Sequence, residues 1–190
     1  MTGMNGRRPS GLVVGSLIAI SFGTVFVMTN SGGLPAPWPL VLRVAAAVVA
    51  VGLLLELFRT ARVAQETPPP GGGYGDRRYL AIVAVEVVAL FGGLAVINQV
   101  LEWPEVTIAW VALVVGVHFF GLAWVWRMPL YHWLGAAMTV LGLGGFLAYA
   151  LGASAATIEL IAGVGSGVAL FATVAVALRV ARQSRELTPA

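Results

Sequence analysis

The sequence contains no cysteine and no lysine, and it has few charged residues of either sign. Without cysteine the chain has no disulfide, no thiolate nucleophile and no cysteine-ligated zinc or iron–sulfur centre. Charged residues make up only 10% of the 190 positions, whereas soluble domains carry about 25%. Because 59% of the residues are hydrophobic, the composition predicts an integral membrane protein.

Six apolar stretches are long enough to cross about 30 Å of hydrocarbon at about 1.5 Å per residue. They predict an all-α fold of six transmembrane helices in one membrane domain covering 1–190, and they leave no room for a soluble catalytic domain. The first span is expected to be retained, because no A-x-A cleavage site follows it. The predicted spans are 11–29, 38–58, 79–99, 107–126, 131–151 and 157–179.

All eleven basic residues are arginines, and ten of them lie at the N-terminus, at the C-terminus or in the even-numbered connections between spans. The positive-inside rule therefore predicts a multi-pass protein of the cell membrane with both termini in the cytoplasm. Arg43 is the exception. The pI near 10.0 does not indicate nucleic-acid binding, because no basic stripe is interleaved with aromatic residues on a solvated face.

The connection at 64–78, "AQETPPPGGGYGDRR", contains three prolines and four glycines. Proline and glycine disfavour a continuous helix here, so the segment is predicted to be a flexible cytoplasmic linker. Its glycine run lacks the Gly-Lys-Ser/Thr ending of a phosphate-binding loop. In the last span, Gly163 and Gly167 have the spacing of close helix packing, within the bundle or between the subunits of a homo-oligomer.

The stretch "AIVAVEVVALFGG" at 81–93 places one acid, Glu86, among apolar residues. An ionisable group near the centre of a membrane helix costs at least about 2.5 to 3.5 kcal/mol, so it needs a partner, water or a function. Glu86 and His118 of the next span are both expected about 10 to 12 Å from the cytoplasmic ends of their helices. A contact between Glu86 and His118 is therefore predicted, as a structural fastening or as a proton-handling site.

A helical step of about 100° per residue defines the rest of the face that carries Glu86. Gly93 on this face leaves space for a neighbouring helix or a ligand. The other residues predicted on it are Tyr79, Ile82, Ala89 and Ile97.

The remaining acids have interfacial explanations. Glu56 is close enough to the cytoplasmic end of its span to extend to the surface, and Glu102, Glu105 and Glu159 lie at or near the outer surface. Arg43, about five residues inside the outer end of span two, is expected to pair with Glu159, Glu102, Glu105 or Asn98, or to contact an anion or a lipid headgroup.

Span four and the loop after it are rich in aromatic residues. Trp103, Trp126, Tyr131 and Trp133 fit an interfacial aromatic belt. Trp110, Phe119, Phe120 and Trp124 are candidates for an aromatic pocket beside Glu86, since aromatic faces attract cations. No haem site is expected, because His118 and His132 lie at different depths.

An acid beside an aromatic pocket suits protonation of an alkene and rearrangement of the carbocation. This layout resembles the small membrane-bound terpene cyclases of bacterial and fungal meroterpenoid and indole-terpenoid pathways, in size, helix number, lack of cysteine and the acid-plus-aromatic arrangement. The resemblance implies an isomerase- or lyase-type enzyme acting on a lipophilic, isoprenoid-like substrate. Glu86 and His118 would be catalytic, and Trp110, Phe119, Phe120, Trp124 and Arg43 would bind the substrate.

No cofactor is expected, and the lack of clustered aspartates argues against magnesium-dependent ionisation of a diphosphate. Two alternatives stay open. One is a proton or small-solute channel or transporter that uses Glu86 and His118 as a relay. The other is a structural subunit of a membrane assembly.

Overall fold

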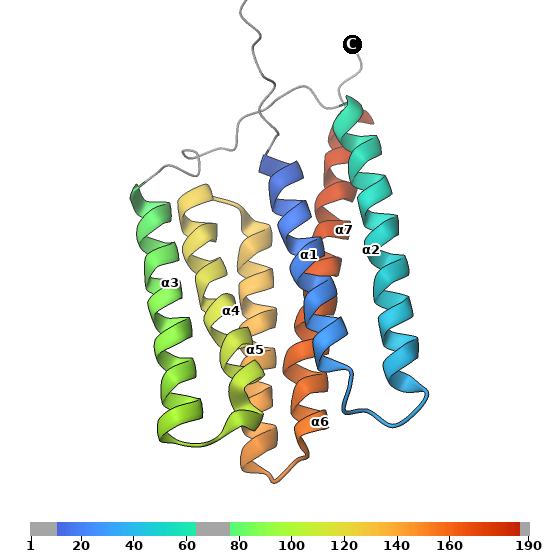
Figure 1. The fold of residues 1–190 in the computed structure, drawn as a ribbon. Helices are drawn as coiled ribbons and strands as arrows, with labels where there is room; N and C mark the ends of the chain where they lie inside the picture. Colours follow the sequence, from blue (N-terminus) through green and yellow to red (C-terminus); the bar gives the residue numbers. More distant parts are fainter. Residues whose placement is uncertain (1–10, 64–76, 187–190) are drawn as a thin grey trace, which may run out of the picture.

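The computed structural model describes residues 11–63 and 77–186, and these form helices joined by short connections. Six helices are long and apolar enough to cross a membrane, and the described residues contain no strand. The predicted all-helical architecture with six candidate spans is therefore confirmed, and it is compatible with a multi-pass membrane protein (Figure 1). The helices are α1 (Gly11–Asn30), α2 (Trp38–Val63), α3 (Arg77–Ala95), α4 (Thr107–Trp126), α5 (Pro129–Ala150), α6 (Ala155–Ile158) and α7 (Gly165–Glu186).

Several helices begin at other residues than predicted, because the sequence analysis did not consider the residues that favour a helix start. Arg77 and Arg78, predicted in the linker, begin α3, while the rest of the linker lies outside the described residues. Pro129 lies in the first turn of α5, where its missing N–H costs nothing because the first helical N–H groups have no partner inside the helix. Ser154 caps α6 by accepting a hydrogen bond from Thr157 N at 3.4 Å.

Two spans contain π-helical segments that the sequence analysis did not predict. One continues α3 from Val96 to Val100, and Leu101 N–H donates to Val96 O at 2.9 Å, five residues earlier. The other, Glu159–Val164, joins α6 to α7. A π-helical turn adds a residue to the local winding, so the helical face shifts at these points.

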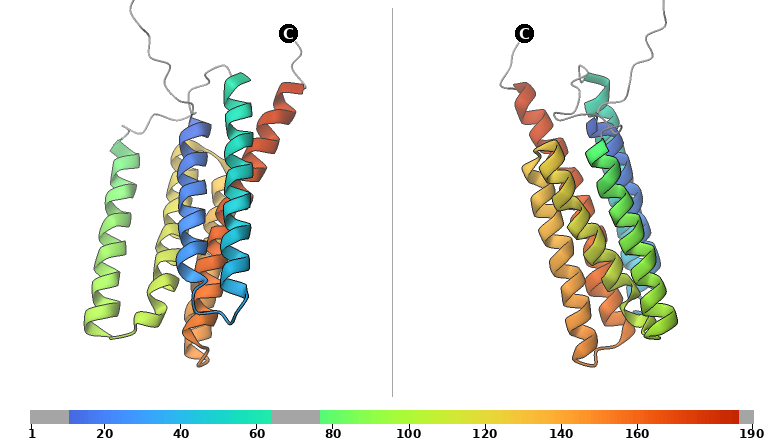
Figure 2. Two further views of the ribbon diagram at one scale, coloured as in Figure 1. Left: turned by 45° about the vertical axis from the view of Figure 1, so that its right-hand side comes forward. Right: turned by 90° about the vertical axis from the view of Figure 1, so that its left-hand side faces the viewer.

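The helices run up and down the long axis of the bundle (Figures 1 and 2). The start of α1, the end of α7 and the turn between α4 and α5 lie at one end, called here the terminal end (Figure 1). The connections after α1, α3 and α5 lie at the opposite end, called here the loop end. Glu86 belongs to α3 and His118 to α4, and these two helices lie side by side in both figures.

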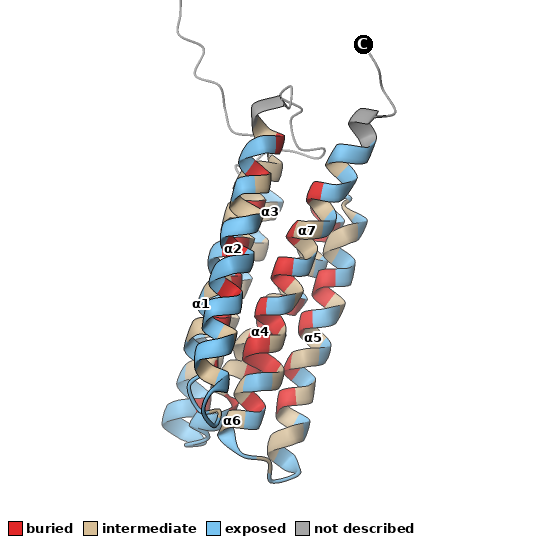
Figure 3. Cartoon of the chain, turned by 90° about the vertical axis from the view of Figure 1, so that its right-hand side faces the viewer, coloured by how far each residue is buried: buried red, intermediate tan, exposed pale blue. Residues whose placement is uncertain are grey.

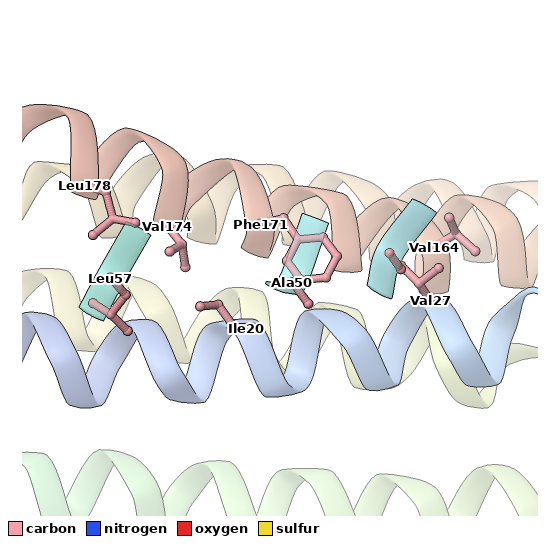
Figure 4. Close-up of a cluster of buried hydrophobic side chains, with 9 residues drawn as sticks. Ile20, Val27, Ala50, Leu57, Val164, Phe171, Val174 and Leu178 are labelled. Atoms are coloured by element: carbon pink, nitrogen blue, oxygen red, sulfur yellow. The ribbon is translucent and has the colours of Figure 1, made fainter. Parts of the chain in front are cut away.

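The apolar core is divided along the bundle. One cluster joins α1, α2 and α7 through Leu57, Phe171 and Val174, among others (Figure 4). Other clusters involve α4 and α5, where Met138 is fully buried. Buried residues gather along the inner faces of the helices, and the outward faces are exposed and apolar (Figure 3), as expected of surfaces that meet lipid tails.

Glycine allows α4 and α5 to pack closely. A Cβ atom on Gly142 would lie 2.6 Å from Leu113 N and 2.8 Å from Ala109 O, and one on Gly116 would lie 2.6 Å from Thr139 N. In the same way, α1 and α7 meet where a Cβ on Gly167 would lie 2.7 Å from Gly23 O. The glycines of spans five and six therefore serve packing within the bundle, as small residues do between helices in lipid.

Candidate functional site: an acid and a base between α3 and α4

Glu86 on α3 and His118 on α4 meet as the sequence predicts. His118 Nδ1 lies 3.0 Å from Glu86 Oε2. The two atoms are nevertheless not aligned as a hydrogen bond, and Nδ1 has no other hydrogen-bond partner among the described residues. The contact is therefore an electrostatic approach at hydrogen-bonding distance.

The α3 face that carries Glu86 packs along α4 at every predicted position. Tyr79 stacks on Trp126 with ring centroids 5.6 Å apart. The side chain of Ile82 lies 3.1 Å from where a Cβ on Gly121 would be. Three turns beyond Glu86, Ile97 is buried in a cluster that includes Ala109 of α4. The 3.6-residue period thus places Glu86 in the contact line between the two helices.

Trp110 fills the space that glycine leaves on α3. Its indole ring lies against Gly93 so closely that a methyl group there would overlap the ring. Trp110 Nε1–H donates to Ala89 O at 3.2 Å. The space predicted beside Gly93 exists, but Trp110 occupies it, so Trp110 seals the α3–α4 contact toward the loop end.

The other residues predicted to line an aromatic pocket contact different partners. Phe119 contacts the His118 ring edge-on at 5.8 Å and the Tyr131 ring at 5.7 Å. Phe120 meets the ring of His132 at 6.2 Å. Trp124 is 67% exposed, and Arg78 Cζ lies 5.6 Å from its ring centroid. Because Trp110, Phe119, Phe120 and Trp124 have different partners, the structure does not gather them around Glu86.

Arg43 does not take part in this site. It lies on α2, and its Nε donates to Ser31 Oγ at 3.1 Å. Within residues 11–63 and 77–186, Arg43 has no ion pair with Glu159, Glu102 or Glu105 and no hydrogen bond with Asn98, so the predicted pairings are wrong. The hydroxyl of Ser31, twelve residues earlier in the chain, supplies the nearer acceptor.

Two contacts in different parts of the bundle were missed by sequence reasoning. Glu56 of α2 forms an ion pair with Arg182 of α7, which joins two helices distant in the chain. Trp126, predicted in the interfacial belt, is only 8% exposed and packs between Tyr79 and Tyr131. The sequence indicated that Glu56 and Trp126 lie near helix ends. It did not indicate which helix packs beside each of them.

Polar chemistry in the spans is otherwise sparse. No three His, Asp or Glu side chains come together as a candidate metal site in the described part of the chain. Three threonine hydroxyls, those of Thr24, Thr29 and Thr173, donate to a carbonyl four residues earlier. Within the described residues, Glu86 and His118 thus form the contact between an acid and an imidazole, in addition to the Glu56–Arg182 ion pair.

No protein-family model, curated protein or solved structure matches the chain. The fold and the site define a class only: a helical protein of multi-pass membrane type with an acid and a base paired between two of its spans. The argument for a function rests on that pair.

Proposed function

We propose that the protein transfers protons through a six-helix bundle in the cell membrane, with Glu86 and His118 as the exchanging pair and both termini in the cytoplasm. The observation that supports this proposal is the 3.0 Å separation of Glu86 Oε2 and His118 Nδ1 within two apolar spans. A carboxyl group and an imidazole at this distance can pass a proton directly once they are aligned.

The pair can hold a proton in either of two forms without a net charge in the hydrocarbon. In one form Glu86 is a neutral acid and His118 a neutral base; in the other the proton has moved from Oε2 to Nδ1, which leaves a carboxylate beside an imidazolium. A paired ion costs far less in a membrane than an isolated one. Uptake of a second proton, or loss of one, then requires contact with water.

The groups that flank the pair differ between the two ends of the α3–α4 contact. The side chains of Glu86 and His118 are 21% and 11% exposed. Trp110 on Gly93 closes the contact line toward the loop end, whereas the tyrosines Tyr79 and Tyr131 lie on the side of the terminal end. Their hydroxyl groups can carry protons through water, so we place the first exchange at the terminal end.

Proton flux into proteoliposomes loaded with a pH-sensitive dye tests the proposal. Wild-type protein under a potassium diffusion potential is expected to acidify the lumen faster than empty liposomes do. Glu86→Gln should reduce the rate to that of empty liposomes, because an amide cannot release a proton. Glu105→Gln, an exposed acid at the loop end, is the matched control and should keep the wild-type rate.

The result that would contradict the proposal is equally direct. If folded wild-type protein gives no flux above empty liposomes, or if Glu86→Gln transports as fast as the wild type, the pair is not a relay. Size-exclusion profiles and thermal melting of each variant in detergent show whether it is folded.

A second candidate function is an intramembrane isomerase of the terpene-cyclase type. The observation that favours it is that Glu86 remains 21% exposed on α3, a helix with no buried residue in its α-helical part, while the Phe119 ring lies against His118. A lipophilic substrate can therefore reach the acid from the bilayer. Glu86 would transfer its proton to an alkene carbon, and loss of a proton from a neighbouring carbon to the resulting carboxylate would end the reaction.

Deuterium incorporation distinguishes this candidate from transport. Membranes containing the protein are incubated with a prenylated aromatic substrate in deuterated water. Isomerisation predicts a product that retains the substrate's elemental composition and gains one deuterium, and Glu86→Gln should abolish it. Wild-type membranes that form no such product would count against the enzyme while leaving the flux result unaffected.

A further inference from the structure

A shallow hollow lies on the outer surface of the turn between α4 and α5, at the terminal end. Its volume is about 590 Å³ and it is open to the surroundings. The lining combines two exposed tryptophans with basic and small residues, and none of the lining side chains is acidic. These residues are Ala123, Trp124, Arg127, Pro129, His132 and Trp133.

One arginine lines the hollow, and a second lies beside one of its tryptophans. Arg127 lies in the turn itself and is exposed. Arg78 of α3 has its guanidinium carbon 5.6 Å from the ring centroid of Trp124. Arg127 has no ion pair and no side-chain hydrogen bond within residues 11–63 and 77–186. Its guanidinium therefore offers several unshared N–H donors in a fork that matches phosphate oxygens.

The backbone at Arg127 has a conformation that is uncommon for an arginine. Arg127 ends α4 with φ of 51° and ψ of 39°, the left-handed conformation, and its N–H donates to Ala123 O. Glycine is the usual residue at such a helix end, because a Cβ atom is strained there. The chain nevertheless carries an arginine at this position, and a strained conformation of this kind is typical of sites with a function.

The depth of the hollow identifies the class of ligand. Trp124 and Trp133 are 67% and 77% exposed at the ends of two candidate spans. Tryptophans at this level occupy the boundary between headgroups and acyl chains. An anion bound beside them therefore belongs to the headgroup layer, and the apolar faces below it contact acyl chains.

We propose that this hollow binds an anionic glycerophospholipid, with Arg127 contacting its phosphate and with Trp124 and Trp133 flanking the glycerol and the start of the acyl chains. The charge of Arg78 over Trp124 adds to the attraction for the headgroup. This site is separate from the Glu86–His118 pair, so it does not depend on the proposed proton transfer.

Native mass spectrometry of the detergent-purified protein tests the proposal with Arg127→Gly. Glycine relieves the left-handed backbone, so the variant should melt at the same or a higher temperature than the wild type. Loss of one basic contact should nevertheless weaken phosphatidylglycerol binding about fivefold. The combination separates lipid binding from folding, because an unfolding defect would lower both.

Controls define the source of the anion and the place of binding. Phosphatidylcholine should bind more weakly than phosphatidylglycerol to the wild type, and inorganic phosphate should not compete with phosphatidylglycerol. Arg179→Ala changes an exposed arginine near the same end of the bundle and should keep wild-type binding.

Three results would overturn the proposal. Equal phosphatidylglycerol binding by wild-type protein and Arg127→Gly would exclude Arg127 as a contact. An equal loss in Arg179→Ala would indicate diffuse attraction to the basic end. Competition by inorganic phosphate would indicate a site for free phosphate.

Discussion

Glu86 and His118 are stable in an apolar surrounding only as a pair. Removing either partner leaves the other polar group in the α3–α4 contact without compensation, which costs about 3 to 5 kcal/mol for a buried ion pair. Replacing both by apolar residues removes the desolvation cost together with the attraction. The same contact therefore fastens α3 to α4 and holds the proton in the proposed function.

The first prediction is that the effects of Glu86→Leu and His118→Leu on stability are strongly non-additive. Each single variant should lower the melting temperature in detergent, whereas the double variant should melt above either one. Because the two atoms are 3.0 Å apart and each single variant leaves an uncompensated partner, a coupling of about 3 kcal/mol or more is expected. Thermal melting followed by intrinsic tryptophan fluorescence measures it, and simple additivity would show that the contact is absent in solution.

Gly93 and Gly92 form a natural matched pair for a second prediction. A methyl group on Gly93 would overlap the Trp110 ring, while one on Gly92 would meet nothing within 4 Å. Gly93→Ala should therefore destabilise the protein by about 1 to 3 kcal/mol by forcing α3 from α4, and Gly92→Ala should be neutral or slightly stabilising. Melting temperatures compare the two, and equal effects would contradict the observed position of Trp110.

Among the helices, α3 is the least embedded. Its α-helical part, Arg77–Ala95, has no buried residue, and its main helical neighbour is α4. At the opposite edge of the bundle in Figure 1, α2 is held to α7 by the ion pair of Glu56 with Arg182 and by the apolar cluster around Leu57. A displacement of α3 would expose Glu86 and His118 without disturbing the packing of α1, α2 and α7.

A third prediction concerns the close contact of α4 with α5. A Cβ on Gly142 would approach the backbone atoms Leu113 N at 2.6 Å and Ala109 O at 2.8 Å, which cannot rotate away. Gly142→Ala should separate the helices and cost about 1 to 3 kcal/mol.

Gly144, two residues after Gly142 on α5, is the control for that experiment. Its nearest neighbour would be Ile161 Cγ2 at 3.4 Å, an ordinary contact, so Gly144→Ala should leave the melting temperature unchanged or raise it. A Gly142→Ala protein as stable as Gly144→Ala would show that the α4–α5 packing is looser than described.

The helices could be predicted from the sequence because the length of an apolar run governs where a span lies. The span predicted at 107–126, for example, coincides with α4. The facing of Glu86 and His118 followed from depth and helical period. The length of apolar runs does not indicate which helices are neighbours. Arg43 was therefore assigned to the wrong partners, although it donates to Ser31. For the same reason Trp110 was expected in a pocket, although it packs on Gly93.

At the scale of the whole molecule, most charged residues are segregated between the two ends of the bundle, with Arg43 and Glu56 among the exceptions. Arg59, Arg127 and Arg179 lie toward the terminal end, and Glu102, Glu105 and Glu159 toward the loop end. Arginines next to the spans favour the cytoplasmic side, and the negative surface potential of the cytoplasmic leaflet attracts them further. The terminal end is therefore expected to face the cytoplasm, which would also place the proposed lipid site in the cytoplasmic leaflet.

Because the chain has no cysteine, single cysteines report its orientation without background. Leu151 is 77% exposed beyond α5 at the loop end, and Gln183 is exposed near the end of α7. In intact cells a membrane-impermeant maleimide should label Leu151→Cys and spare Gln183→Cys, whereas after permeabilisation both should react. The opposite pattern in intact cells would reverse the orientation, and it would move the first proton exchange at Glu86 and His118 to the outer face of the membrane.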